Sequence, residues 1–250
     1  MGYQIHQKNN VLVFTITRPD RRNAVNYEVM DGLDEAVSLA ENDHSIKILL
    51  ITGEGTQAFC AGGDLQEFHG LKTQEESFGM LSRMGGILYR LATLDKVTVA
   101  YINGTAVGGG CEIAAACDYR FARPGAKLGF VQGTLAITTG WGGGTLLYER
   151  LPANQAFRLL TEAHILTGEE LNELGFIDQV LQASSADELI EQFEPVIQKT
   201  GPVLSAYKKM LTRKWIASDL KERMASEIYE CSVLWESEEH HAAVGRFLNK

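Results

Sequence analysis

Cysteine and proline are scarce in this sequence, and the few cysteines follow no recognisable spacing. The 250 residues include four cysteines and five prolines, with no C-x-x-C pair and no other metal-binding spacing. This excludes the disulfide framework of small secreted domains and the zinc sites that paired cysteines build. We therefore expect no metal site and four buried free thiols in a reducing cytoplasm: Cys60, Cys111, Cys117 and Cys231.

The sequence also lacks an excess of positive charge and any long apolar run. Its 23 Lys and Arg residues against 32 Asp and Glu residues give a formal net charge of −9, whereas a general nucleic-acid binder needs a basic face. No apolar run approaches the ~18 residues of a membrane span, and the N-terminus shows no export signal. With 45% hydrophobic and 22% charged residues, the composition is typical of a globular cytoplasmic protein that binds neither nucleic acid nor membranes.

Glycine, in contrast, is clustered around one segment. Residues 97–102 are apolar and β-branched, which predicts a buried strand, and Gly108 to Gly110 then lead into a predicted helix with Glu112 in its first turn. Glycines let a ligand approach the main chain, and the free N–H groups of a first helical turn attract a negative oxygen. Neither a phosphate loop nor a G-x-G-x-x-G spacing is present. A tight turn followed by a glutamate that the helix dipole favours would produce the same pattern.

A second glycine corner upstream repeats this design. Residues 59–65 place a short apolar segment before Gly62 and Gly63, and Asp64 follows them. Both corners can present main-chain N–H groups to a ligand. The repetition favours a binding site over two unrelated turns.

Periodicity along the chain predicts an α/β fold with two parts. Strands alternate with helices through residue 185, and nearly continuous apolar strands indicate parallel pairing with both faces covered. Only helical patterns follow, so we divide the chain into a core of residues 1–185 and a helical region of residues 186–250. We expect the polar segment 66–80 to form a mobile flap. Strands are predicted at residues 3–8, 11–17, 46–52, 97–102, 119–122, 127–130 and 176–181. Helices are predicted at residues 27–41, 79–93, 153–162, 168–174, 186–198, 203–216, 218–235 and 239–248, and from about residue 145.

Taken in order, several of these motifs resemble the crotonase superfamily, which is the enoyl-CoA hydratase/isomerase family. The resemblance covers essentially the whole chain, and the set of motifs is specific although each motif alone is weak. The residues that carry it are Arg18-Pro19, Asn23-Ala24, residues 59–65, Asn103-Gly104, residues 108–118, residues 237–240 and residues 247–250.

The resemblance implies a crotonase-like spiral of ββα units, with a helical C-terminal region that closes the site and supports homo-trimers or hexamers. It implies an acyl-CoA thioester substrate, so coenzyme A arrives as part of the substrate and no other cofactor is expected. The N–H groups of Gly63 and Gly109 would hold the thioester oxygen as an oxyanion hole, and Glu112 would move a proton. The substrate contacts that it implies are Arg22, Ala24, Ala61, Gly63, Asp64, Leu65, Gln66, Gly109 and Trp141. Arg21 and Lys250 are further candidates for the coenzyme A phosphates.

One position departs from the pattern of the family's hydratases, which use two catalytic glutamates. The first falls on Glu112, but Gln132 occupies the place of the second, and an amide cannot act as a titrating acid or base. Decarboxylation of a carboxyacyl thioester forms the enolate directly and needs only one proton donor. The segment with Gln132 and Trp141 also looks closer to ethylmalonyl-CoA decarboxylases, although Trp141 could simply pack in its turn. We therefore expect a one-glutamate lyase, with a hydratase or isomerase of fatty-acid metabolism and a non-catalytic coenzyme A-binding subunit as alternatives.

Overall fold

Two β-sheets form the framework of the computed structural model, which describes residues 2–183 and 186–248. The larger sheet has the strand order β1-β2-β3-β5-β7-β10, and the smaller has the order β4-β6-β8-β9. All pairings are parallel except the β1–β2 hairpin and the β8–β9 pair. The strands of the larger sheet are β1 (Tyr3–Lys8), β2 (Val11–Ile16), β3 (Ile48–Gly53), β5 (Val97–Ile102), β7 (Tyr119–Ala122) and β10 (Gln179–Val180). Those of the smaller sheet are β4 (Ala58–Cys60), β6 (Thr105–Val107), β8 (Lys127–Gly129) and β9 (Leu166–Thr167).

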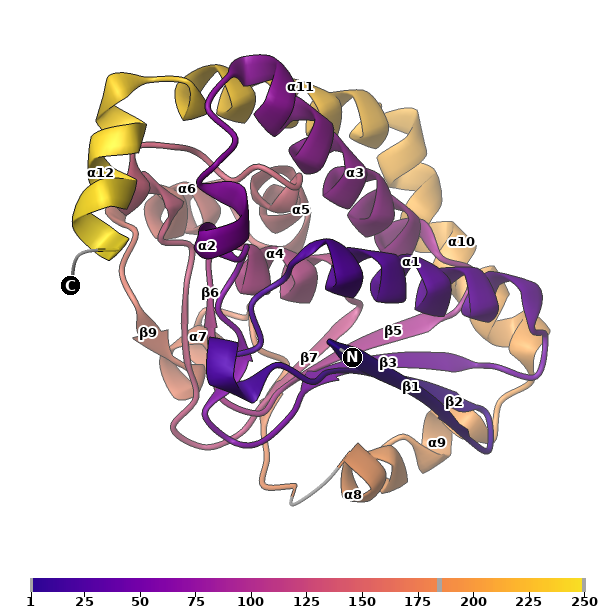
Figure 1. The fold of residues 1–250 in the computed structure, drawn as a ribbon. Helices are drawn as coiled ribbons and strands as arrows, with labels where there is room; N and C mark the ends of the chain where they lie inside the picture. The colour runs from indigo at the N-terminus through magenta and orange to yellow at the C-terminus, as the bar shows by residue number, and fades with distance from the viewer. Residues whose placement is uncertain (1, 184–185, 249–250) are drawn as a thin grey trace.

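The central strands of the larger sheet are apolar on both faces because helices cover both. All six residues of β3 are buried, as expected for a parallel strand between two layers. On one face Leu49 and Ile51 join the main core with helices α1 (Tyr27–Asn42), α3 (Gln74–Thr93) and α4 (Gly109–Ala116). The opposite face packs against α8 (Ala186–Glu191) and α9 (Glu194–Ile197), which lie beneath the sheet in Figure 1.

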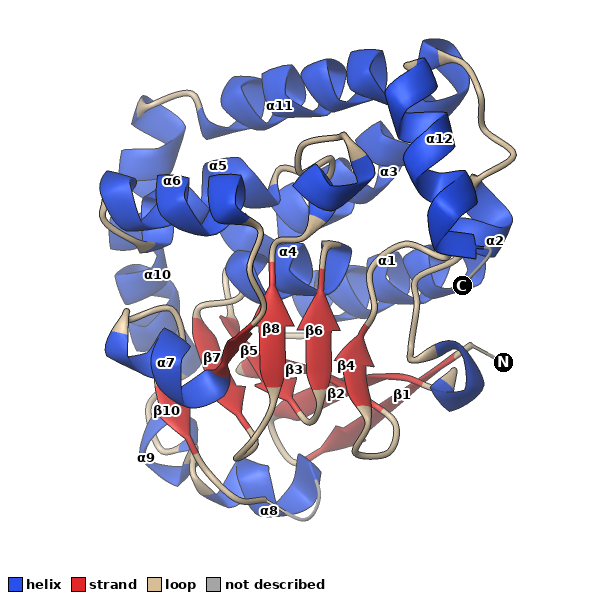
Figure 2. Cartoon of the chain, turned by 90° about the vertical axis from the view of Figure 1, so that its left-hand side faces the viewer, coloured by secondary structure: helices blue, strands red, loops and turns tan. Residues whose placement is uncertain are grey.

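The smaller sheet directs its parallel strands toward one edge, where the functional site lies. Figure 2 shows the carboxyl ends of β4, β6 and β8 side by side, facing the helical layer. The chain leaves this edge into α2 (Leu65–Phe68), into α4, and into the 3₁₀ turn η2 (Gln132–Leu135). The remaining elements of the core are η1 (Pro19–Arg21), α5 (Gly143–Arg150), α6 (Ala153–Glu162) and α7 (Gly168–Glu173).

Three long helices complete the chain: α10 (Gly201–Ala217), α11 (Leu220–Trp235) and α12 (Glu238–Leu248). Helix α11 packs along α3 and against α5, and α12 packs against η2. Met224, Ile228 and Cys231 of α11 belong to the main core, so the predicted C-terminal helices cover the site-bearing layer. None of the helices in the described residues is long and apolar enough to cross a membrane.

The structure confirms the α/β class and the helical C-terminal region, and it corrects several local predictions. The expected flap at residues 66–80 is instead α2 and the start of α3: Phe68 is buried, and Thr73 with Glu76 forms a capping box. The strand predicted at 176–181 is limited to β10, and the helix predicted at 186–198 is two short helices. Strands β4, β6 and β9 were not predicted, because two or three residues show no detectable alternation.

Candidate active site

A cavity of about 160 Å³ lies at the edge where β4 and β6 end. Its walls come from the two glycine corners, from η2 and the loop after it, from α3, and from the ends of α11 and α12. The polar residues among its lining are Glu112, Gln132, Thr134, Thr138 and Cys231, and the described lining includes no lysine, arginine or histidine. The cavity is therefore a largely apolar pocket with one carboxyl group, a common composition for a small-molecule site.

The two glycine corners meet at this cavity. A Cβ atom added to Gly62, whose φ of 86° suits glycine, would lie 3.1 Å from the amide nitrogen of Gly109. The backbone of Val25 pairs with the first corner through bonds to Gly62 and Asp64. Within the described residues, the N–H groups of Gly63 and Gly109 donate no hydrogen bond to the protein. Both glycines line the cavity, so two unused main-chain donors border it.

Glu112 is the buried acid of the site. It is 2% exposed, and its Oε2 accepts hydrogen bonds from the N–H groups of Trp141 and Gly143, both at 2.9 Å. Its Oε1 accepts from Gln132 Nε2 at 2.9 Å and from the Gly140 N–H at 3.4 Å. Burial raises the pKa of Glu112 to about 7 and the negative charge of Glu227 adds to this, while the hydrogen bonds act in the opposite direction. At neutral pH the group can both carry and release a proton.

Gln132 lies directly beside Glu112 but cannot share its chemistry. Its amide nitrogen is committed to Glu112, and the side chain is nearly buried, at 9% exposed. Its Oε1 atom has no hydrogen-bond partner among the described residues. The amide therefore orients the carboxyl group on one side and offers one free acceptor on the other.

Large side chains limit the volume of the pocket. A Cβ atom on Gly109 would lie 2.1 Å from the indole ring of Trp141, so this ring packs directly on the glycine corner. Trp141 is 4% exposed and lines the cavity, which combines the packing and pocket-lining roles expected of it. Trp235 of α11 and Phe247 of α12 line the cavity too, and the Trp235 Nε1–H donates to the Leu71 carbonyl at 3.0 Å. The helical region thus forms part of the wall.

The structure brings together only some of the residues that the sequence analysis proposed. Lining the cavity are Ala61, Gly63, Leu65, Gly109, Glu112, Gln132 and Trp141. Not lining it are Arg22, Ala24, Asp64 and Gln66, and Lys250 lies outside the described residues.

The contacts of Asp64 and its neighbours explain why these predicted residues do not line the cavity. The Asp64 carboxylate pairs with Arg18 at 2.7 Å and caps α2 through the Gln66 N–H. Arg18 also donates to the Ala24 carbonyl, and Arg21 donates to the exposed Gln66 side chain. Asp64 and Arg18 thus hold the first glycine corner in place, and Arg22 is exposed beside it.

The sequence analysis missed one half-buried acid near Glu112. Glu227 of α11 accepts hydrogen bonds from the N–H groups of Gly144 and Thr145, at 3.0 and 2.6 Å. It is 115 positions from Glu112 in sequence and lies within an ordinary amphipathic helix pattern, so no local signal indicates it. Only the packing of α11 against α5 brings the two together.

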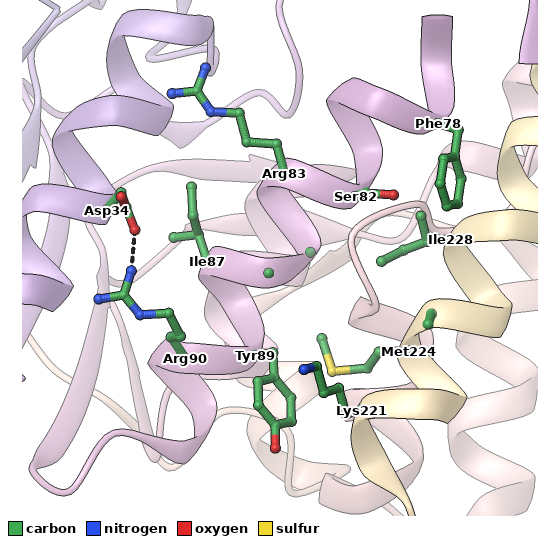
Figure 3. A pocket seen from close by; sticks show the side chains of 13 residues that line it. Asp34, Phe78, Ser82, Arg83, Ile87, Tyr89, Arg90, Lys221, Met224 and Ile228 are labelled. Carbon is green, nitrogen blue, oxygen red and sulfur yellow. Dashed lines mark hydrogen bonds and ion pairs between the residues drawn. The ribbon is translucent and has the colours of Figure 1, made fainter. Parts of the chain in front are cut away.

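A larger hollow elsewhere lacks comparable chemistry. About 560 Å³ in volume, it lies between α1, α3 and α11, and Figure 3 shows its lining. Its arginines are already engaged, Arg90 with Asp34 and Arg83 with Asp31. Nor do the described residues contain a cluster of three or more side chains that could hold a metal ion. The pocket at Glu112 is therefore the candidate active site.

Comparison with known proteins agrees with this geometry. The enoyl-CoA hydratase/isomerase family matches residues 6–250. A short-chain-enoyl-CoA hydratase of Clostridium acetobutylicum is 29% identical, and the match covers 98% of this chain and 94% of the hydratase. The ethylmalonyl-CoA decarboxylase of Homo sapiens is 33% identical, and the match covers 81% of this chain and 67% of the decarboxylase. The crystal structure of an enoyl-CoA hydratase from Bacillus halodurans gives a TM-score of 0.88 at 25% identity, covering 98% of this chain and 100% of that one. The chain therefore belongs to the enoyl-CoA hydratase/isomerase family.

Proposed function

We propose that this protein is a one-carboxylate lyase that removes carbon dioxide from a carboxyacyl-CoA thioester. The bond between the α carbon and the substrate carboxylate breaks, and its electron pair passes into the thioester to form an enolate. The N–H groups of Gly63 and Gly109 bind the enolate oxygen as an oxyanion hole. Glu112 then gives its proton to the α carbon and regains one from water.

The observation that carries this proposal is the hydrogen bond from Gln132 to Glu112. Two-carboxylate hydration needs a second acid, and an amide stands in its place. Cys231 is the other ionisable group in the described lining, and burial raises the pKa of its thiol well above the ordinary value. Glu112, with a pKa of about 7, is thus the one group there that can exchange a proton near neutrality.

The absence of a cation from the described lining also favours decarboxylation. A substrate carboxylate that enters an apolar pocket loses its hydration, and without a positive partner its charge is costly there. Loss of carbon dioxide moves that charge to the thioester oxygen, where two N–H groups can receive it. A preorganised donor at such a position contributes roughly 10²–10³ in rate.

The relatives are consistent with either of two reactions. Ethylmalonyl-CoA decarboxylases and short-chain-enoyl-CoA hydratases both occur among them. Hydration is the second candidate, and the free Oε1 of Gln132 favours it because this atom could accept a hydrogen bond from an attacking water. A coenzyme A-binding subunit without activity has no use for a buried acid with a pKa of about 7.

The remaining assignments follow from the same proposal. The coenzyme A moiety runs past Ala61 and Leu65 at the cavity rim, and no other cofactor takes part. The protein acts as a cytoplasmic homo-trimer or hexamer.

Turnover of matched thioesters tests the proposal. The protein is incubated with ethylmalonyl-CoA, methylmalonyl-CoA and crotonyl-CoA, while carbon dioxide release and hydration are followed separately. The two malonyl-type thioesters are expected to turn over faster. Faster hydration of crotonyl-CoA would overturn decarboxylation in favour of the second candidate.

A substitution sharpens this test. Gln132→Glu restores a second carboxyl group beside Glu112 and is expected to raise hydration relative to decarboxylation. Gln179→Glu makes the same change at an exposed position of β10 and should leave the ratio unchanged. No gain in hydration for Gln132→Glu would show that the amide does not select the reaction.

A further inference from the structure

Two carboxyl groups share the N-terminus of one short helix. The eight-residue helix α5 begins at Gly143, directly after Trp141 and Gly142, and its N-cap has no side-chain partner. Glu112 accepts the N–H groups of Trp141 and Gly143. Glu227 accepts those of Gly144 and Thr145. The N–H groups of Gly143, Gly144 and Thr145, which an isolated helix would leave unsatisfied, are thus divided between an acid from α4 and an acid from α11.

From this arrangement we propose that Glu227 is a positioning residue for Glu112. It fixes the first turn of α5, whose N–H groups hold the Glu112 carboxyl group, and it places a second negative charge behind that group. Glu227 does not line the cavity at Glu112, so it acts through Glu112 and does not touch the substrate.

The immediate surroundings of the pair contain no compensating cation. Neither Glu112 nor Glu227 forms an ion pair in the described part of the chain. Instead, side-chain hydrogen bonds from Thr139 and Thr145 reach Glu227. Several ionisable groups lie on the elements around the pair. Cys111 of α4 and Cys231 of α11 interact electrostatically with Glu112, Tyr148 and Glu230 line an outer hollow together with Glu227, and α12 carries His240.

These neighbours do not change the sign of the effect. Burial raises the pKa of Cys111 and Cys231, so both thiols stay neutral. Burial also lowers the pKa of His240, whose ring bonds to the Leu135 carbonyl. Glu230 is exposed at the outer hollow that Glu227 also borders. None of these groups supplies a positive charge that would offset the effect of Glu227 on the pKa of Glu112.

A shared helix terminus couples the protonation of the two acids. Burial raises the pKa of both, and the charge of Glu227 raises that of Glu112 further. Two nearby carboxyl groups release their protons in two steps that belong to the pair. Glu227 therefore keeps Glu112 protonated to a higher pH than burial alone would.

The consequence for catalysis rests on the proposed function. If Glu112 donates a proton to the enolate, the rate falls as pH rises through its pKa. In Glu227→Gln that pKa is lower, so the fall begins at lower pH and the variant loses most activity on the alkaline side. Were Glu112 to act as a base, the shift would have the same direction but would increase activity on the acid side.

The direct test measures the proton on Glu112 without any turnover. Protein labelled with ¹³C at the glutamate carboxyl carbons is titrated by NMR, and the Glu112 signal is identified by its loss in Glu112→Gln. In Glu227→Gln the midpoint of the Glu112 titration is expected to fall by about one pH unit, a tenfold change in proton affinity. Glu230→Gln removes an exposed acid of the same helix and should leave the midpoint unchanged.

Two outcomes are decisive. A midpoint in Glu227→Gln that matches the wild-type protein would overturn the inference. So would equal loss of activity at all pH values in a variant that retains its fold by circular dichroism, because a purely structural role produces that result. If the midpoint shifts but no decarboxylation occurs, the proposed function fails and the coupling of the two acids stands.

Discussion

The two ends of α4 each hold an acidic side chain that is largely removed from water, and they stabilise it in opposite ways. At the N-terminal end, Glu112 is surrounded by N–H donors and a second acid, Glu227. Just beyond the C-terminal end, Asp118 is paired with Lys208, at 2.6 Å from Nζ to Oδ1, and lies 3.7 Å from Arg150. One acid has only neutral donors, whereas the other has two cations.

This difference separates a carboxyl group whose pKa is raised to about 7 from one that is paired with two cations. Burial lowers the pKa of Lys208, but the charge of Asp118 opposes that shift. Arg150, with its pKa lowered to about 10 by burial, also donates to the Ala115 carbonyl and stacks on Trp215. These contacts tie α10 and α5 to the helix end. The ion pairs of Asp118 thus join three segments of the fold, whereas Glu112, without a cation among the described residues, has the raised pKa that is common at functional sites.

The largest expected effect comes from removing the titrating acid. Glu112→Gln keeps the shape of the side chain but cannot give up a proton, so turnover of a carboxyacyl-CoA should fall by roughly 10²–10⁴. Binding of the acyl-CoA, measured by calorimetry, should change little because the two main-chain donors remain. Glu191→Gln, an exposed position on α8, serves as the control. Unaltered turnover in Glu112→Gln would remove Glu112 from the mechanism.

Breaking the ion pair between Asp118 and Lys208, just beyond the C-terminal end of α4, should lower the free energy of unfolding. Lys208→Met leaves Asp118 with the more distant Arg150 and the neutral donors of Thr98, and loss of one partner of a buried pair costs about 3 kcal/mol or more. Lys209→Met breaks an exposed pair with Asp95 and should cost less than about 1 kcal/mol. Urea denaturation of both variants gives the comparison. Equal stabilities would show that the Lys208 pair does not contribute to folding.

Glu112, at the N-terminal end of α4, should make the stability of the folded protein depend on pH. The folded-state pKa of Glu112 is about 7 against an ordinary 4.5, so the folded protein binds this proton more tightly than the unfolded chain does. Its contribution is complete below pH 4.5 and is lost as pH rises to 7, a loss of about 3 kcal/mol. Glu112→Gln should lack this dependence. Parallel curves of unfolding free energy against pH for the two proteins would contradict the raised pKa.

A smaller effect is expected at the pocket wall. Trp141→Ala removes the ring that packs on Gly109 and should relax the acyl selectivity by about tenfold in kcat/KM toward longer acyl groups. Phe157→Ala, at a side chain that is 60% exposed, is the matched aromatic control. If Trp141→Ala and the unsubstituted protein show the same ratio of kcat/KM for long and short acyl groups, another residue of the wall sets the size limit.

Sequence reasoning reached those parts of the molecule that depend on local pattern. The strand at 97–102, the glycine run and Glu112 follow one another closely, so the corner could be predicted without coordinates. The upstream corner with Gly63 repeats the pattern, the resemblance to the family then paired its N–H with that of Gly109, and both glycines line the same cavity. The prediction of a flap at residues 66–80 was wrong. The sequence does contain a signal for the helix found there, because Thr73 and Glu76 have the spacing of a capping box.

What the sequence could not predict depends on packing between distant segments. The role of Asp64 became clear only once Arg18 was seen beside it, 46 residues away. Glu227 and Trp235 lie near the site because α11 packs along α3 and against α5. The sequence of α11 alone does not predict which helices it packs against. Burial by distant segments and the charge of Glu227 raise the pKa of Glu112, so the chemistry was less predictable than the fold.

The N–H groups of Gly63 and Gly109, which donate no hydrogen bond within the described residues, belong to the main chain. Substitutions elsewhere in the pocket therefore leave both donors in place. Substitution by any residue but proline leaves an N–H in place, whereas one codon change converts Gln132 or Trp141 into a different group. Side chains at the pocket can therefore change while these two main-chain N–H groups remain at its border.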